Sequence, residues 1–204
     1  MRILAATAIM ATALVALPSS QTSQDSRPSS SLERAFPSNG RINFSLSAGE
    51  YRITGSPDNR LRLKWSVRDA DDLSKVFAAA DVSGREATIT TDGPNNFKAD
   101  IQVPLRADLY VRLTAGELTI EGIEGNKDVS LHAGELDIDV GRAEDYHSVA
   151  ASVWAGEVHA TPFHVSKEGL FRSFNWNGKG PYTLEARLKA GEVHLRSKGE
   201  SVAR

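Results

Sequence analysis

The sequence contains no cysteine. Disulfide bonds, thiolate catalysis and cysteine-ligated zinc are therefore excluded, and so is a lipid-modified cysteine at the start of a mature chain. The sequence also lacks an excess of either charge, because 24 Lys and Arg residues stand against 26 Asp and Glu residues. Nothing in that balance indicates a nucleic-acid partner. A nucleophile elbow, a phosphate-binding loop and a metalloprotease helix are also absent from the sequence.

The start of the chain has the pattern of a targeting segment. Arg2 precedes an apolar run over residues 3–17, which ends in Pro18-Ser19-Ser20. This pattern predicts a secretory signal peptide over residues 1–20, with cleavage after Ala16 or Ser20. The run is short for a membrane span, and an uncleaved N-terminal anchor is the alternative. We therefore expect an exported protein of the periplasm, the cell envelope or the outside of the cell, with no transmembrane span once mature.

Composition divides the rest of the chain. Residues 21–40 are rich in Ser, Gln and Pro, which predicts a flexible linker. Residues 41–198 form the expected domain, and residues 199–204 a short tail. A mature chain of about 180 residues is long enough to bury its own core without disulfides.

An Ala-Gly-Glu triplet occurs five times. The copies are Ala48-Gly49-Glu50, Ala115-Gly116-Glu117, Ala133-Gly134-Glu135, Ala155-Gly156-Glu157 and Ala190-Gly191-Glu192. With each Ala numbered zero, positions −2, +3 and +5 are apolar in every copy. A straight strand would turn positions −2 and +3 to opposite faces. The chain must therefore bend or bulge at Gly-Glu, and we expect each triplet to be a structural repeat corner, with its Ala facing the core.

The spacing of the triplets indicates a stack of similar units. The copies at Ala115, Ala133 and Ala155 are 18 and 22 residues apart. Periods near 20 with short strands predict an all-β, parallel β-solenoid (β-helix) in which each coil lies on the previous one. Residues 122–128 and 140–145 have the composition of turns that close the coils.

Three further segments have patterns of their own. Leu73, Val76, Phe77 and Ala80 have helical spacing, so one short helix is expected over residues 69–80. A strand is expected where apolar residues alternate with polar ones from Phe97 until Pro104. Residues 170–182 hold four aromatic residues and form either an extra coil or a covering loop.

The segment DLYVRLTAGELTIEGIEGNKDVSLHAGELDID, residues 108–139, resembles the bacterial putative-adhesin domains of unknown function. Repeats in that family typically read small-Gly-Asp or Gly-Glu followed by alternating apolar residues, and they are related in style to the β-helical bactofilins. The resemblance covers about residues 41–198. It implies a β-helical fold and an adhesin-like role, although Glu here replaces the more usual Asp.

The repeated glutamates could form a column that binds Ca²⁺. Each coil offers only one carboxylate, whereas Ca²⁺ takes six to eight oxygen ligands, so we interpret the glutamates as solvated corners. Position +4 places Asp137, His159 and His194 in one outward column if the coils stack in order, and these residue types can hold zinc. This column remains a speculative metal site; we assign no metal and expect no cofactor.

Position −1 contains His132 and Trp154. An exposed Trp beside a His could stack on a sugar ring. Because large aromatic side chains tend to be buried, we expect instead that Phe171, Phe174 or Trp176 covers Trp154.

Two functions remain open. The first is an exported, non-catalytic scaffold or surface-binding, adhesin-like protein of the bacterial cell envelope. Its partner would be a cell-surface polymer, an envelope protein or another copy of the chain. The second is a carbohydrate-active or metal-dependent enzyme built on a β-helix. A deeply buried cluster of ionisable groups in a concavity would favour the enzyme, whereas a solvated, evenly charged surface would favour the scaffold. We predict the first function and no enzymatic activity.

Overall fold

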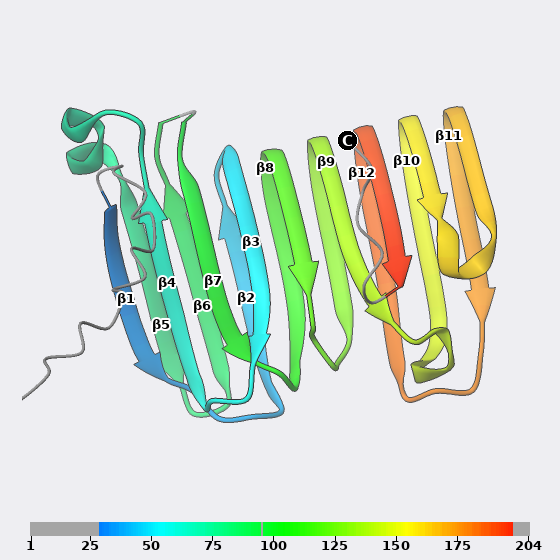
Figure 1. Cartoon of the computed structure of the whole chain (residues 1–204), viewed down its shortest axis with the longest axis horizontal. Helices are drawn as coiled ribbons and strands as arrows, with labels where there is room; N and C mark the ends of the chain where they lie inside the picture. The colour runs from blue at the N-terminus through cyan, green and yellow to red at the C-terminus, as the bar shows by residue number, and fades with distance from the viewer. Residues whose placement is uncertain (1–28, 95, 198–204) are drawn as a thin grey trace, which may run out of the picture.

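The computed structural model describes residues 29–94 and 96–197, nearly all of them in one mixed twelve-stranded β-sheet (Figure 1). The strands are β1 (Ser29–Ala35), β2 (Gly40–Leu46), β3 (Gly49–Ser56), β4 (Arg60–Ser66), β5 (Phe77–Ser83), β6 (Glu86–Asp92), β7 (Lys98–Pro104), β8 (Ala107–Glu121), β9 (Lys127–Gly141), β10 (Tyr146–Ala160), β11 (Val165–Asn177) and β12 (Tyr182–Ser197). Three 3-10 helices interrupt them: η1 (Ala70–Lys75), η2 (Ala143–Asp145) and η3 (Thr161–Phe163). The all-β fold class is confirmed. None of the helices in the described part of the chain has the length and apolar character needed to cross a membrane.

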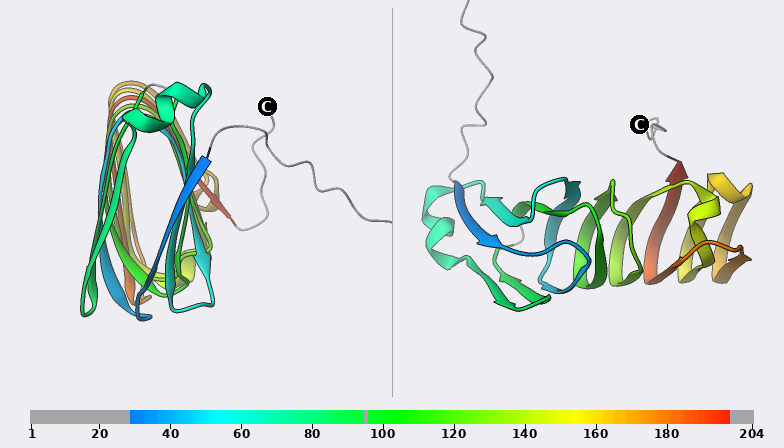
Figure 2. Two further views of the ribbon diagram at one scale, coloured as in Figure 1. Left: turned by 90° about the vertical axis from the view of Figure 1, so that its left-hand side faces the viewer. Right: turned by 90° about the horizontal axis from the view of Figure 1, so that it is seen from below.

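The long strands β8, β9, β10 and β12 each carry one Ala-Gly-Glu triplet near the middle. Seen along the stack, the strands form two walls that meet at a bend along one side (Figure 2, left). In β8 the buried residues Leu113 and Leu118 flank four residues that are not buried. The bend thus lets both halves of one strand direct apolar side chains into the same interior.

The strands do not stack in sequence order. Neighbouring strands follow the order β8, β9, β12, β10 and β11, so β12 lies between β9 and β10 and runs parallel to both. β10 and β11 form an antiparallel pair at one end of the stack, and the chain then returns to the free edge of β10. The expectation that each coil lies on the previous one is wrong here, because the β10–β11 hairpin occupies the other edge of β10.

The N-terminal half continues the stack with shorter strands. β2 pairs in parallel with the first half of β8 (Leu46 with Leu113) and β3 with the second half (Gly49 with Gly116), so together they replace one bent strand. β6 and β7 extend the two walls in the same way. β5, β4 and β1 complete this end through antiparallel pairs.

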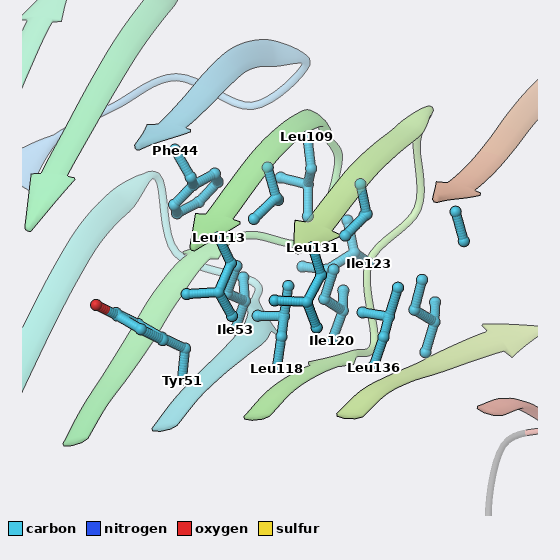
Figure 3. Close-up of a cluster of buried hydrophobic side chains, with 14 of the residues drawn as sticks. Phe44, Tyr51, Ile53, Leu109, Leu113, Leu118, Ile120, Ile123, Leu131 and Leu136 are labelled. Carbon is cyan, nitrogen blue, oxygen red and sulfur yellow. The ribbon is translucent and has the colours of Figure 1, made fainter. Parts of the chain in front are cut away.

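The core lies between the two walls. Leu109, Leu113 and Leu131 approach Leu118, Ile120 and Leu136 across the interior (Figure 3), and all six side chains are at most 2% exposed. Burial of each such side chain stabilises the fold by about 1.5–3 kcal/mol. The apolar positions −2, +3 and +5 of the repeats supply most of this core.

The domain extends beyond its expected N-terminal boundary. β1 falls inside the segment 21–40 that composition marks as a linker, yet all seven of its residues pair with β4. Leu32 packs against the core, and Glu33 forms ion pairs with Arg60 and Arg62. The linker prediction is therefore wrong from residue 29 onward. Residues 1–20 and 199–204 lie outside the described residues.

The helix expected over residues 69–80 is also wrong in its second half. Only the 3-10 helix η1 forms, and Asp69 makes no side-chain cap hydrogen bond. Residues from Phe77 onward form β5, which pairs with β6 from Phe77–Asp92 to Ser83–Glu86. Hydrogen bonds to β6 override the helical spacing, and Phe77 is left 56% exposed.

The strand before Pro104 is confirmed: Phe97, directly before β7, and Ala99, Ile101 and Val103 within it are all buried. The two expected turns form within narrower bounds, over residues 122–126 and 142–145, because β9 takes up the remaining residues of both segments. Residues 170–182 form neither an extra coil nor a covering loop; they contain most of β11, the antiparallel last strand, and the turn into β12.

Candidate functional site

The bend gathers the triplets into one surface feature, which we call the corner ridge. It comprises positions −1 to +2 of the five copies, namely residues 47–50, 114–117, 132–135, 189–192 and 154–157 in their spatial order. None of its five alanines is buried, and Ala133 and Ala190 are exposed. The expectation that position 0 faces the core is therefore wrong: the four residues of the bend all lie outside it.

Glycine is required at the bend for two reasons. Gly116, Gly134, Gly156 and Gly191 all have φ between 119° and 138°, which L side chains rarely adopt. A Cβ on Gly134 would also lie 1.8 Å from the main-chain oxygen of Gly116 in the neighbouring strand. The glycines thus form a ladder of close main-chain contacts along the ridge.

The glutamates of the five triplets lie in register, and Glu168 of β11 continues their row across from Glu157. Adjacent strands are roughly 4.8 Å apart, so these carboxylates are close neighbours. Glu50 forms an ion pair with Lys98. Glu157 and Glu192 contact histidine side chains two residues further along their own strands, at 2.8 and 3.2 Å. The row is therefore partly compensated by neighbouring side chains.

The column speculated to bind a metal exists, in the order Asp137, His194 and His159. The two imidazole rings stack with centroids 5.1 Å apart and planes 8° from parallel. The Asp137 carboxylate forms a two-point ion pair with Arg196. In residues 29–94 and 96–197, no group of three His, Cys, Asp or Glu side chains is arranged to hold a metal ion.

Apolar side chains are exposed at the β10–β11 end of the ridge. Trp154 is 58% exposed, Leu170 59% and Phe171 70%, and the rings of Trp154 and Phe171 meet edge to face at 5.7 Å. Of the three aromatic residues expected to cover Trp154, only Phe171 contacts its ring, and the expectation that Trp154 is buried is wrong. Phe174 and Trp176 instead pack around Phe163, at ring distances of 5.2 and 5.0 Å.

Phe171 adopts a strained conformation. Its φ of 53° is unusual for a bulky residue and costs of order 1–3 kcal/mol. Because the ring is so exposed, core packing does not offset this cost. Residues held in this way cluster at functional sites, so the Trp154–Phe171 pair is the strongest candidate for a contact surface.

Lys127 is the buried charge that the sequence did not reveal. It is 1% exposed, and its Nζ donates to the main-chain oxygens of Ile123 and Gly125 and to the Tyr146 hydroxyl. Burial lowers the pKa of Lys127 to about 8, against the opposing effect of Asp139 and other carboxylates, while burial raises the pKa of Tyr146. All three ammonium hydrogens have acceptors, so Lys127 fastens the turn between β8 and β9. Its place at an alternating core position of β9 was the available signal.

Neither a protein-family model nor a curated protein matches this chain. Among solved structures, a putative cell adhesion protein from Clostridium sporogenes superposes with a TM-score of 0.55 and 15% identity, over 84% of this chain and 100% of that one. A putative adhesin from Parabacteroides merdae gives 0.33 and 11%, over 85% and 82%, and one from Bacteroides fragilis gives 0.29 and 9%, over 84% and 98%. Only the first value exceeds 0.5, so the chain shares its fold with the Clostridium sporogenes protein, and that likeness extends to the fold alone.

Proposed function

We propose that this chain is an exported, non-catalytic β-solenoid that binds a polymer of the bacterial cell surface through the β10–β11 end of its corner ridge. The observation that carries the proposal is the Trp154–Phe171 pair, which is exposed although Phe171 is strained. Aromatic rings presented in this way offer apolar faces for sugar rings and other amphipathic groups. The name of the Clostridium sporogenes structure, a cell adhesion protein, agrees with such a role.

The charged groups support binding rather than catalysis. Arg112, Asp128 and Arg187 form a continuous ion-pair row across β8, β9 and β12. Of the two buried charged residues in the part of the chain that the structure describes, Asp137 is engaged by Arg196 and Lys127 by main-chain oxygens. Such an arrangement holds strands together and leaves the exposed aromatic pair as the main contact surface.

Glycan-array and cell-wall pull-down binding of residues 29–204 tests the proposal. We expect Trp154→Ala and Phe171→Ala each to weaken binding at least about tenfold, the loss typical of an aromatic hot spot. Phe77→Ala is the matched control, because Phe77 is 56% exposed in β5 at the opposite end of the stack. Binding that survives both ridge substitutions, or that Phe77→Ala weakens equally, would refute the proposal.

Export needs a separate test, because residues 1–20 lie outside the described part of the chain. The sequence predicts a mature N-terminus at residues 17–21. Mass spectrometry of the protein purified from its native host measures that terminus directly. Intact cytoplasmic protein beginning at Met1 would contradict export.

A further inference from the structure

A cavity of about 630 Å³ opens at the other end of the corner ridge, over β3 and β8. Its floor is residues 48–50 and 115–117, and its walls are Arg68, Asn96, Phe97 and Lys98. A second cavity of about 180 Å³ adjoins it and shares Glu50, Lys98 and Glu117. The volume lies within the range of small-molecule sites.

Small residues create this space. The Ala and Gly residues of two triplets form the floor, and the loop before β7 rises beside them because Glu50 N–H bonds to the main-chain oxygen of Phe97. A Cβ on Gly49 would lie 2.8 Å from that same oxygen. The cavity is thus a notch between the ridge and this loop.

The notch is lined by both acidic and basic side chains, and only some of them form ion pairs with each other. Glu50 and Lys98 form an ion pair with each other. Glu117 and Arg68 form no ion pair or side-chain hydrogen bond with any other described residue, although both line the cavity. One carboxylate and one guanidinium are therefore available to a molecule bound in the notch.

We propose that this notch binds a small zwitterion, with Glu117 accepting hydrogen bonds from its ammonium group and Arg68 donating to its carboxylate. The size of the notch fits a short peptide with both termini free. Hydrogen bonds between charged partners are the strong ones, and Arg binds carboxylates with two parallel N–H donors. The site goes beyond the proposed function and does not depend on it, because Trp154 lies at the opposite end of the ridge.

A ligand with a single charge fits less well. Because Glu50 and Lys98 are paired with each other, a simple cation would gain one free partner, Glu117, and a simple anion would gain one, Arg68. Either ligand would leave the other charged group without a counter-charge. A molecule that carries both charges satisfies Glu117 and Arg68 together and leaves the Glu50–Lys98 pair in place.

Isothermal titration calorimetry of the full-length protein with diglycine and triglycine tests the site. N-acetyl-diglycine, which lacks the ammonium, and diglycine amide, which lacks the carboxylate, are the matched probes. We expect the zwitterions to bind at least about tenfold more tightly than either probe, as the loss of one charged hydrogen-bonding partner implies. Glu117→Gln should remove the preference over the acetylated probe, and Arg68→Gln the preference over the amide.

Glu135→Gln is the control variant, because Glu135 occupies the same repeat position one strand further along, outside the cavity. It should bind as the wild type does. If neither zwitterion binds the wild type, or if Glu135→Gln weakens binding as much as Glu117→Gln, the proposed site is wrong. Glycan binding through Trp154 is measured separately, so the two proposals fail independently.

Discussion

Lys167 of β11 lies directly across from Val158 of β10, at a position that is apolar in every Ala-Gly-Glu repeat. On the other side of the bend, Arg172 lies across from Val153 in the same way. Lys167 donates to the main-chain oxygen of Ser173 at 2.7 Å, and Arg172 to that of Glu168, so both cations span the inside of the bend. The last strand thus carries charge where the preceding strands carry core residues. Charged residues that point inward are a known protection of an open sheet edge.

We predict that these two cations prevent the stack from growing at β11. A second copy added about a two-fold axis with its bend in register would place Lys167 across from Arg172 of the partner subunit, burying like charges. The double variant Lys167→Leu/Arg172→Leu should remove this barrier and dimerise with increasing concentration, whereas the wild type should remain monomeric. Sedimentation velocity between about 5 and 100 μM measures the difference, in a range that detects micromolar association.

The control for this prediction replaces two cations elsewhere. Arg142→Leu/Lys189→Leu makes the same change in charge and apolar surface on exposed positions away from β11. It should stay monomeric. If it associates as readily as the β11 variant, association reflects general hydrophobicity and not the edge.

Lys127 predicts an unusual dependence of stability on pH. Burial lowers its pKa from 10.5 to about 8, so between those values the unfolded chain binds more protons than the folded one. The contribution of Lys127 to the free energy of unfolding should therefore rise from pH 8 to pH 10, by about 2 kcal/mol at roughly 1.4 kcal/mol per unit. Tyr146 and Tyr51 oppose this rise as the pH approaches 10 and reverse the slope above it, because their raised pKa values keep protons that the unfolded chain loses.

Urea denaturation at pH 7, 8, 9 and 10 measures this profile. Lys127→Met should abolish the rise between pH 8 and 10, whatever its effect on stability at pH 7. Lys189→Met, which changes an exposed lysine, should keep the wild-type profile. A profile that rises equally in Lys127→Met would assign the effect to another group.

The alternation of apolar residues predicted the bend and the two-walled core, because the face to which a side chain points in a strand follows from the few residues on either side of it. The strand order could not be predicted in this way. β9 and β10 carry the same triplet, so either could pair with the other or with β12. Because β11 pairs with one edge of β10, for example at Gly156–Gly169, β12 pairs with the other edge and lies between β10 and β9. The exposure of Trp154 could not be predicted for a similar reason. Phe174 and Trp176 pack against Phe163 and not against Trp154, and no sequence pattern links Phe163 to these two residues.

The column Asp137–His194–His159 also depends on that order, and it yields a stability prediction. The Asp137 and Arg196 side chains are only 10% and 16% exposed, so replacing Asp137 removes a two-point ion pair from a partly dry site. Asp137→Asn should lower the free energy of unfolding by about 2–3 kcal/mol, somewhat less than for a fully buried pair. Chemical denaturation with and without zinc measures the change. An effect that appears only when zinc is present would instead make the column a metal site.

The last prediction separates the structural and chemical roles of the triplet. A side chain at Gly134 must adopt a φ of 132° and place its Cβ 1.8 Å from the Gly116 oxygen, so Gly134→Val should cost at least about 3 kcal/mol or prevent folding. Glu135→Gln keeps the shape of a side chain that is 45% exposed and 4.0 Å from His194, and should change stability by about 0.5 kcal/mol or less. Thermal melts of both variants, each with and without Ca²⁺, compare the two effects. Because the glycine ladder and not the carboxylate row forms the bend, Gly134→Val should lower the melting temperature more than Glu135→Gln does, both with and without Ca²⁺. Greater damage from Glu135→Gln, present only with Ca²⁺, would identify the glutamate row as a cation site.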